Sequence, residues 1–270
     1  MTTEIRTATH AGLHVYESGQ AGQPLLLFLH GSPLSGRMWL PQLERLTDFH
    51  SLAPDLPEHG LSSEVRPFSM EDVVRRLAIL VRGAAPGGGA HVIGQSFGGV
   101  VAQALMVREP GMLDRVILTG TSARMSGLLY GLLRLSLALN RPLLRLLSSG
   151  SLAALVRWQT GIPRAVSPLI EEDLKKVDPD SLSRFILATY GAIVTPTQGR
   201  SPVLVLVGEK ETPVARSMAR RLWRTIPRAH GAWVRGLGHV WNLQDPDLFV
   251  DVVRAWVHDD PLPGRLVSFT

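Results

Sequence analysis

The sequence lacks several features that would point to other kinds of protein, beginning with cysteine. Its 270 residues contain no cysteine, which excludes disulfide bonds, thiolate nucleophiles and cysteine-ligated metal sites. No apolar run approaches the roughly 18 uninterrupted residues expected of a membrane-spanning helix. The N-terminal stretch carries Glu4 and Arg6 and has no apolar segment typical of a signal peptide. We therefore expect a cytoplasmic protein without a membrane span.

Excess positive charge is also scarce outside one segment. Between Ser122 and Arg200 there are ten Lys or Arg residues against five Asp or Glu residues. That surplus equals the net charge of +5 of the whole chain, so the remainder is neutral. A nucleic-acid-binding protein should instead show a dense basic stripe with interleaved aromatic residues. We predict no nucleic-acid partner.

What the chain does have is a 45% hydrophobic content, ample for the core of one large domain. Apolar runs alternate with helical periodicity in both outer parts of the chain. Such alternation predicts an α/β fold built on a doubly wound, mostly parallel sheet. The expected strands are 4–17 as a hairpin, then 24–29, 51–55, 90–93, 115–119, 202–208 and 232–234.

From about 122 to 196 this alternation stops, and leucine-rich helical stretches replace it. They are expected at 128–147, 152–158, 171–177 and 181–192. The segment is interpreted as a helical insertion. It divides the chain into a core of residues 1–121 and 197–270 and an inserted segment of residues 122–196.

The stretch Gly94–Gly99 organises the rest of the chain. It reads Gly-Gln-Ser-Phe-Gly-Gly and joins a predicted buried strand to a predicted buried helix over 100–107. A serine between two glycines at such a junction matches the G-x-S-x-G nucleophile elbow. Because the turn is sharp, a Cβ at Gly94 or Gly98 would collide with the neighbouring strand and helix. Ser96 is the predicted nucleophile.

A serine hydroxyl needs a base to take its proton, and histidine suits this task because its pKa lies near neutral pH. His239 is the best candidate, in a glycine-loosened loop between the last predicted strand and the last helix. The base in turn needs an orienting carboxylate. This chemistry requires neither a metal nor a cofactor, and none is predicted.

The carboxylate should follow the strand 202–208, where Glu209 and Glu211 are the candidates. We prefer Glu211, because it lies deeper in the loop and can turn back over the sheet. Glu209 is expected to be a solvated charge, and it remains the alternative. The order Ser96, Glu211, His239 is the order expected after this type of elbow.

An oxyanion that forms at the serine needs two N–H donors. One should be the backbone amide of Phe97, at the start of the predicted helix. The other should come from the turn at 30–33, and the amide of Ser32 is the best candidate. A tight turn without a donor aimed at the substrate is the alternative interpretation of 30–33.

With these residues in place, the chain resembles α/β-hydrolase-fold enzymes of the esterase and C–C-hydrolase type. The resemblance rests on five short segments, in the family's order: 30–33, 55–60, 94–99, 208–211 and 238–239. It implies a Ser-acid-His triad, an oxyanion turn after a His-Gly pair, and a helical cap inserted after the sixth strand, here 122–196. The chain departs from the family where Glu58 replaces a usual glycine and Glu211 a usual aspartate. A different path of the 55–60 loop is therefore expected.

The predicted function is a serine hydrolase that cleaves a carboxylic ester of a small molecule through an acyl-enzyme. A C–C hydrolase acting on a diketone, a thioesterase and an acyltransferase remain alternatives, because they use the same residues. A ligand-binding receptor of the same fold is an alternative from another class. The expected oligomeric state is a monomer or a homodimer.

The inserted segment should decide which substrate is accepted. Leucines alternate there with Arg134, Arg141 and Arg145, which fall near one helical face. The simpler interpretation is an amphipathic helix with solvated arginines. The alternative is a surface that attracts anionic or acyl substrates, or that makes transient contact with lipid.

Overall fold

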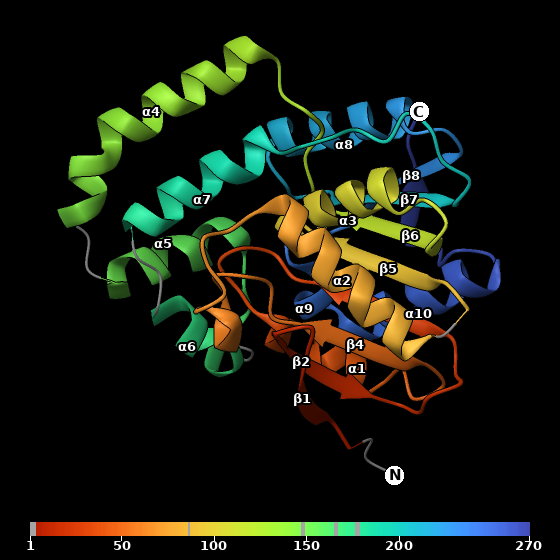
Figure 1. The fold of residues 1–270 in the computed structure, drawn as a ribbon. Coiled ribbons are helices and arrows are strands. Elements are labelled where there is room, and N and C mark those ends of the chain that lie inside the picture. Colours follow the sequence, from red (N-terminus) through yellow and green to blue (C-terminus); the bar gives the residue numbers. More distant parts are fainter. Residues whose placement is uncertain (1–3, 86, 147–148, 165–166, 176–178) are drawn as a thin grey trace.

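The computed structural model describes residues 4–270, apart from residue 86 and the segments 147–148, 165–166 and 176–178. A central sheet has helices on both faces, and a further group of helices, α4 to α7, stands to one side (Figure 1). In the described part of the chain, none of the helices is both long and apolar enough to span a membrane.

Nine strands form one sheet in the order β1-β2-β4-β3-β5-β6-β7-β8-β9. The strands from β4 to β8 pair in parallel, whereas the β1–β2 hairpin and β9 add antiparallel edges. The predicted doubly wound, mostly parallel sheet is therefore confirmed. The strands are β1 Arg6–His10, β2 Leu13–Ser18, β3 Leu25–Leu29, β4 His50–Pro54, β5 Ala90–Gln95, β6 Leu113–Thr119, β7 Val203–Gly208, β8 Ala229–Val234 and β9 Leu266–Ser268.

The strand order reverses between β3 and β5, which are neighbours in the sheet although β4 lies between them in the sequence. In sheets of this kind ligands bind where the order reverses, outside the carboxyl ends of the strands. The turn at 30–33 follows β3 and the elbow follows β5. The fold therefore brings these two predicted parts of the site side by side.

In the part of the core that the structure describes, six α-helices and two short 3₁₀ helices accompany the sheet. These are η1 Gly36–Trp39, α1 Leu40–Leu43, η2 Gly60–Ser62, α2 Met70–Ala84, α3 Phe97–Arg108, α8 Pro213–Thr225, α9 Trp241–Gln244 and α10 Pro246–His258. Side chains cap the starts of several of them, including α2 and α10. The Ser69 side chain accepts a hydrogen bond from the amide of Asp72, and Asp245 caps α10 with Pro246 at its first position.

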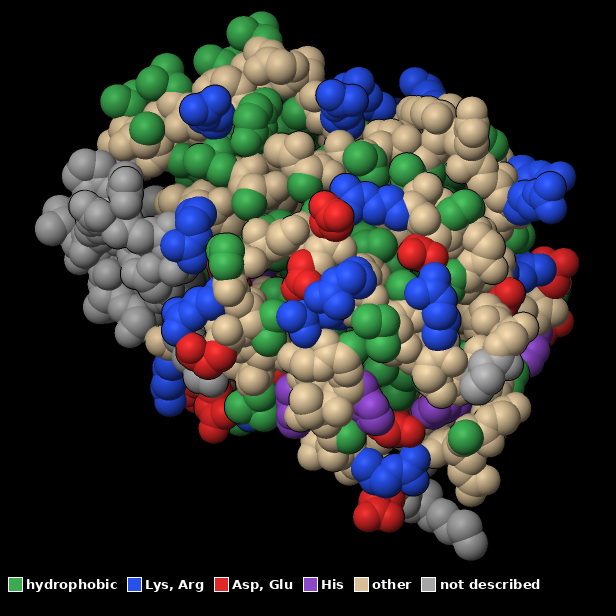
Figure 2. Space-filling model, viewed as in Figure 1, with side chains coloured by type: hydrophobic (Ala, Val, Ile, Leu, Met, Phe, Trp, Pro, Cys, Tyr) green, Lys and Arg blue, Asp and Glu red, His purple; other side chains and the backbone are tan. Residues whose placement is uncertain are grey.

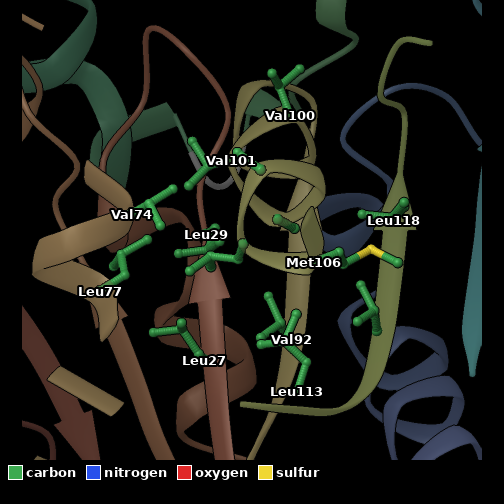
Figure 3. Packing of buried hydrophobic residues seen from close by; sticks show 14 of the residues in the cluster. Leu27, Leu29, Val74, Leu77, Val92, Val100, Val101, Met106, Leu113 and Leu118 are labelled. Atoms are coloured by element: carbon green, nitrogen blue, oxygen red, sulfur yellow. The ribbon is translucent and has the colours of Figure 1, made fainter. Parts of the chain in front are cut away.

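The core lies on both faces of the sheet. On one face, Val74 of α2 and Val101 of α3 pack with Leu29 of β3 and Val92 of β5 (Figure 3). On the other face, residues of α1, α9 and α10 pack against alternate residues of the same strands, such as Phe28. The strands are buried on both faces because their sequences are continuously apolar.

Within the described residues, four helices lie between β6 and β7, in the interval where the resemblance implies a helical cap. They are α4 Gly127–Leu146, α5 Ser149–Thr160, α6 Ser167–Lys175 and α7 Pro179–Gly191. The last residues of the predicted helix 171–177 lie outside the described residues. Treating 122–196 as a separate cap domain stays a prediction.

Several short elements have no counterpart in the sequence prediction, among them β9, η1 and α1. β9 pairs with β8 at the sheet edge through three residues, too few to show a period of two. Helices η1 and α1 follow the 30–33 turn over only eight residues. Helices this short leave little periodicity in a sequence, so tertiary contacts rather than pattern define them.

Candidate active site

Ser96 lies on a tight turn, and the positions of the flanking glycines leave no room for a side chain. Its backbone adopts φ 52° and ψ −112°, outside the usual range for a residue with a side chain. A Cβ on Gly98 would lie 2.0 Å from the carbonyl oxygen of Leu29, and one on Gly94 would lie 2.6 Å from that of Gly98. The predicted collision with strand and helix is thus confirmed, and the glycines allow β5 and α3 to meet at this angle.

Hydrogen bonds to β6 and to the loop that follows it hold the elbow in place. The Ser96 amide donates to the carbonyl of Thr119 at 2.9 Å, and the Thr121 hydroxyl donates to the carbonyl of Ser96 at 2.7 Å. Ser96 itself precedes the first turn of α3, where the amide of Phe97 has no partner four residues back. Because that helix end carries a partial positive charge, it favours an anion.

His239 and Glu211 form a hydrogen-bonded pair. Nδ1 of His239 lies 2.8 Å from Oε2 of Glu211. The Glu211 side chain is 3% exposed and that of His239 is 25% exposed, so the carboxylate is shielded and the imidazole reaches the cavity. A carboxylate accepts hydrogen bonds, so this contact places a proton on Nδ1 and leaves Nε2 as the free base.

Glu209 has a different partner. Its carboxylate accepts a hydrogen bond from the amide of Gly236 at 2.7 Å. It is exposed as predicted, but it braces the loop that carries His239 rather than the imidazole. Of the two candidate acids, the structure brings Glu211 to His239.

Gly120 is a residue of this site that sequence reasoning missed. It follows β6 with φ 56°, and a Cβ there would lie 3.0 Å from Nδ1 of His239 and 3.2 Å from Oε1 of Glu211. The missing side chain therefore makes room for the His–Glu pair. The sequence did offer one signal for Gly120: a glycine, and no acidic residue, follows the carboxyl end of a central strand.

Two buried histidines support the turn that contains Ser32. Nδ1 of His59 donates to the Pro57 carbonyl at 2.9 Å, so Nε2 accepts from the Ser32 hydroxyl at 3.0 Å. Nε2 of His30 accepts from the Leu56 amide at 2.9 Å. Burial lowers the pKa of His59 to about 4 and that of His30 well below its usual value. Both rings are therefore neutral at pH 7 and act as hydrogen-bonding supports for the turn.

The predicted residues line one cavity of about 800 Å³, which contains Ser32, Ser96, Phe97, Glu211 and His239. Its other walls come from α5, α7 and α8 and are mostly apolar. Among the described lining residues, Glu211 is the single acid and Lys210 the single Lys or Arg.

Of the three arginines singled out in the inserted segment, the structure describes the side chain of Arg134 alone. Arg134 is exposed on α4 and does not line the cavity, and the side chains of Arg141 and Arg145 lie outside the described residues. Several leucines of α4 are exposed as well, including Leu128 and Leu139. Contact of this helix with lipid stays a prediction.

An aromatic cluster joins α7 to the elbow. The ring of Phe185 lies 4.6 Å from that of Phe97 and 5.2 Å from that of Phe68. Glu58 supports this joint, because its carboxylate accepts from the Phe68 amide at 2.9 Å and from Arg184 at 3.3 Å. Glu58 adopts φ 65°, the region that glycine favours, so its presence does not by itself require another backbone path.

The described residues contain no group of three or more His, Asp or Glu side chains arranged to hold a metal ion. What the arrangement offers chemically is a hydroxyl, an imidazole oriented by a carboxylate, and a helix N-terminus at one cavity. Together these are the parts of a nucleophilic acyl-transfer site.

Comparisons with known proteins agree with this fold. The model of the alpha/beta hydrolase family matches residues 26–252. An AB hydrolase superfamily protein from Gibberella zeae is 30% identical over 269 residues, covering 92% of this chain and 85% of that protein. The carboxylesterase YbfK of Bacillus subtilis is 22% identical, covering 87% of this chain and 80% of that protein.

Among solved structures, a thermophilic esterase from Thermogutta terrifontis superposes with a TM-score of 0.75. It is 24% identical, and the match covers 95% of this chain and 98% of the esterase, which supports the fold. The family and these relatives support a hydrolase-type enzyme. The family match spans most of the sheet and the inserted helices, and so this chain belongs to the alpha/beta hydrolase family.

Proposed function

We propose that the protein is a serine hydrolase that cleaves a carboxylic ester through an acyl-enzyme intermediate. The observation that carries the proposal is the pairing of His239 with Glu211 in the same cavity as a serine held on a strained elbow. A paired imidazole and a partly exposed turn serine have no evident structural purpose together. Their combination is what nucleophilic catalysis by serine requires.

In the first half of the reaction, Oγ of Ser96 attacks the ester carbonyl and Nε2 of His239 takes its proton. The carbonyl oxygen becomes an oxyanion, and the amides of Phe97 and Ser32 donate to it. Collapse of this intermediate breaks the C–O bond, and His239 returns the proton to the departing alcohol. Glu211 keeps the imidazole in the tautomer that can accept the proton, and stabilises its charged form.

In the second half, a water molecule attacks the acyl carbon while His239 takes a proton from that water. The acid product leaves and the proton returns to Ser96. Because the same groups act in both halves, loss of any one of them should stop turnover and not merely weaken binding.

We propose further that the substrate is uncharged and apolar near its ester bond. The mostly apolar walls of the cavity support this, and so does the presence of only one lining Lys or Arg among the described residues. We also propose that residues 122–196 act as a cap over the cavity, supported by the lining residues that α5 and α7 contribute, such as Val156 and Phe185.

The test is a panel of chromogenic esters of increasing acyl length, with a thioester and a diketone as further arms. Ser96→Ala serves as the blank for each substrate. We expect turnover of neutral esters by the native chain and none by the variant. Preferred turnover of the diketone or the thioester would overturn the ester assignment, and tight ligand binding without any turnover would indicate a receptor.

A further inference from the structure

A second hollow lies along α8, apart from the reactive cavity, and shares no described lining residue with it. Its volume is about 520 Å³. Arginine dominates its lining. The residues that matter for what it can bind are Arg216, Ser217, Arg220, Arg221, Arg224 and Trp233. We call this hollow the arginine groove.

The charge of the arginine groove is not balanced. Helix α8 carries four arginines and no acidic residue, and no described residue lining the groove is acidic. None of the four forms an ion pair with a described Asp or Glu side chain, and Arg220 contacts the backbone oxygen of Thr270, the last residue. On two other helices of the same sheet, arginines do have acidic partners: Arg76 pairs with Asp72 on α2, and Arg254 of α10 pairs with Asp48.

This contrast suggests a purpose, because like charges within three turns of one helix repel one another. Figure 2 shows Lys and Arg side chains over much of this face of the molecule, including its upper edge, where Figure 1 places α8. The rest of the chain outside 122–200 is neutral overall, so the surplus on α8 is local. A local cluster of unpaired guanidinium groups attracts anions.

Arg220 is held in place before any ligand arrives. Its guanidinium lies 5.5 Å from the ring centroid of Trp233, and its Nη2 donates to the backbone oxygen of Thr270 at 3.2 Å. The Trp233 ring is itself fixed by an edge contact with Phe269, at a centroid distance of 4.7 Å. A side chain that is already ordered loses less conformational entropy on binding.

We propose that the arginine groove binds a small molecule that carries two or more adjacent phosphate groups. A guanidinium offers a planar fork that matches two phosphate oxygens, and four forks exceed what one phosphate can use. The volume falls within the range of roughly 300–1,000 Å³ typical of small-molecule sites. A nucleic acid would need a basic track longer than one helix.

The site goes beyond the proposed hydrolase activity and does not depend on it. Val214, Ala215 and Met218 of α8 line the reactive cavity, whereas Arg216, Arg220 and neighbouring residues of the same helix line the groove. Ligand binding is therefore measured directly, by calorimetry on the full chain, and ester turnover is not used as the readout.

The primary probe is inorganic tripolyphosphate at low salt, where exposed charges are least screened. Replacing Arg220 by Gln should raise the dissociation constant roughly tenfold, the loss expected for one charge-assisted contact. Replacing it by Lys should give a smaller rise, because the charge stays and the fork is lost. Replacing all four groove arginines should abolish binding.

A matched control removes the same net charge elsewhere, at four exposed arginines for which no ion pair is described. It carries Arg108→Gln, Arg124→Gln, Arg134→Gln and Arg200→Gln. This control should bind tripolyphosphate within about twofold of the native chain, because remote exposed charges are screened. Thermal melts of all variants check folding, and the single Arg220 variants test the proposal if the fourfold variant does not fold.

Two further arms identify the source of the phosphates. ADP binding tighter than tripolyphosphate, with no binding of adenosine, would indicate a nucleotide, and equal binding would indicate a free oligophosphate. Both outcomes support the site. An absence of tripolyphosphate and ADP binding, an equal loss in the control, or a short DNA duplex binding more tightly than either would overturn it.

Discussion

The carboxyl edge of the sheet and the helices α4 to α7 are held in place by different means. At the edge, close packing leaves little room for a side chain. A Cβ on Gly98 would lie 2.0 Å from the backbone oxygen of Leu29, and one on Gly31 equally close to the Gln95 side chain. The helices meet the core through side-chain contacts. Examples are Ser35 with Asp173 at 2.5 Å and Gln244 with the Gly161 carbonyl at 2.9 Å.

This difference indicates which positions of the protein can tolerate substitutions. A turn defined by missing side chains tolerates almost no substitution, because a backbone oxygen cannot move aside. A contact between side chains can be exchanged for another at modest cost. We therefore expect mutations at the edge to abolish the reaction, and mutations at the contacts of α4 to α7 to change which substrates are accepted.

The sharpest contrast within the edge is between its two glutamates. Glu211→Gln should lower kcat/KM by about 10³- to 10⁴-fold, because the amide no longer holds His239 in the required tautomer. Glu209→Gln should change it by less than about tenfold, since an amide oxygen still accepts from Gly236. Steady-state kinetics on one neutral ester distinguish the two, and equal losses would contradict the assignment of the acid.

Acid should lower the stability of the fold through His59. The pKa of this residue is about 4 in the folded chain, against 6.5 in the unfolded chain. Between these values the unfolded chain binds a proton that the folded chain does not. The free energy of unfolding should therefore fall as the pH falls from 6.5 to 4, by about 3 kcal/mol from this residue.

Urea unfolding at several pH values measures this slope. His59→Gln should be less stable at pH 7, because it loses the Ser32 contact, but its stability should fall less steeply with acid. Some slope remains in the variant, because burial also lowers the pKa of His30 and of His91. An unchanged slope would contradict a buried neutral His59.

Crowding at the elbow can be tested with one methyl group. Gly98→Ala should destabilise the fold by about 1–3 kcal/mol, because its Cβ would meet a backbone oxygen that cannot move aside. Gly111→Ala is the matched control, since a Cβ there meets nothing within 4 Å. Similar melting temperatures for the two variants would show that the elbow is not crowded.

The smallest effect is expected at the contact between Glu58 and Arg184, which is partly exposed. Glu58→Gln keeps an acceptor for the Phe68 amide and loses the ion pair, so stability should fall by no more than about 1 kcal/mol. KM should rise a few-fold for large esters with kcat unchanged, because α7 lines the cavity. A fall in kcat alone would place Glu58 in the chemistry and erase the contrast between the two regions.

Much of the edge could be predicted from sequence because its parts are local. The apolar runs, the elbow around Ser96 and the loop with His239 each occupy a few consecutive residues, and parallel strands bring their ends together. The choice of Glu211 over Glu209 followed from depth in the loop, and the structure places Glu211 against His239. Gly120 was missed, because the need for a glycine there arises from the His239 side chain, which comes from a loop far away in the sequence.

The inserted segment and α8 were harder for the same physical reason. The four helices were expected from leucine periodicity. The packing of Phe185 on Phe97 was not expected, because the two residues lie far apart in the sequence. The arginines of α8 follow a normal amphipathic pattern, so nothing local indicates that they share a groove with Trp233. Non-local packing, not propensity, decides such features.

The most direct test of the central claim is covalent labelling of Ser96 by a fluorophosphonate, followed by intact mass measurement. The native chain should gain one phosphonyl group, because the activated hydroxyl attacks phosphorus and displaces fluoride. Ser96→Ala should gain none while keeping the native melting temperature. Equal labelling of the variant, or an unlabelled native chain, would contradict a nucleophilic serine at this elbow.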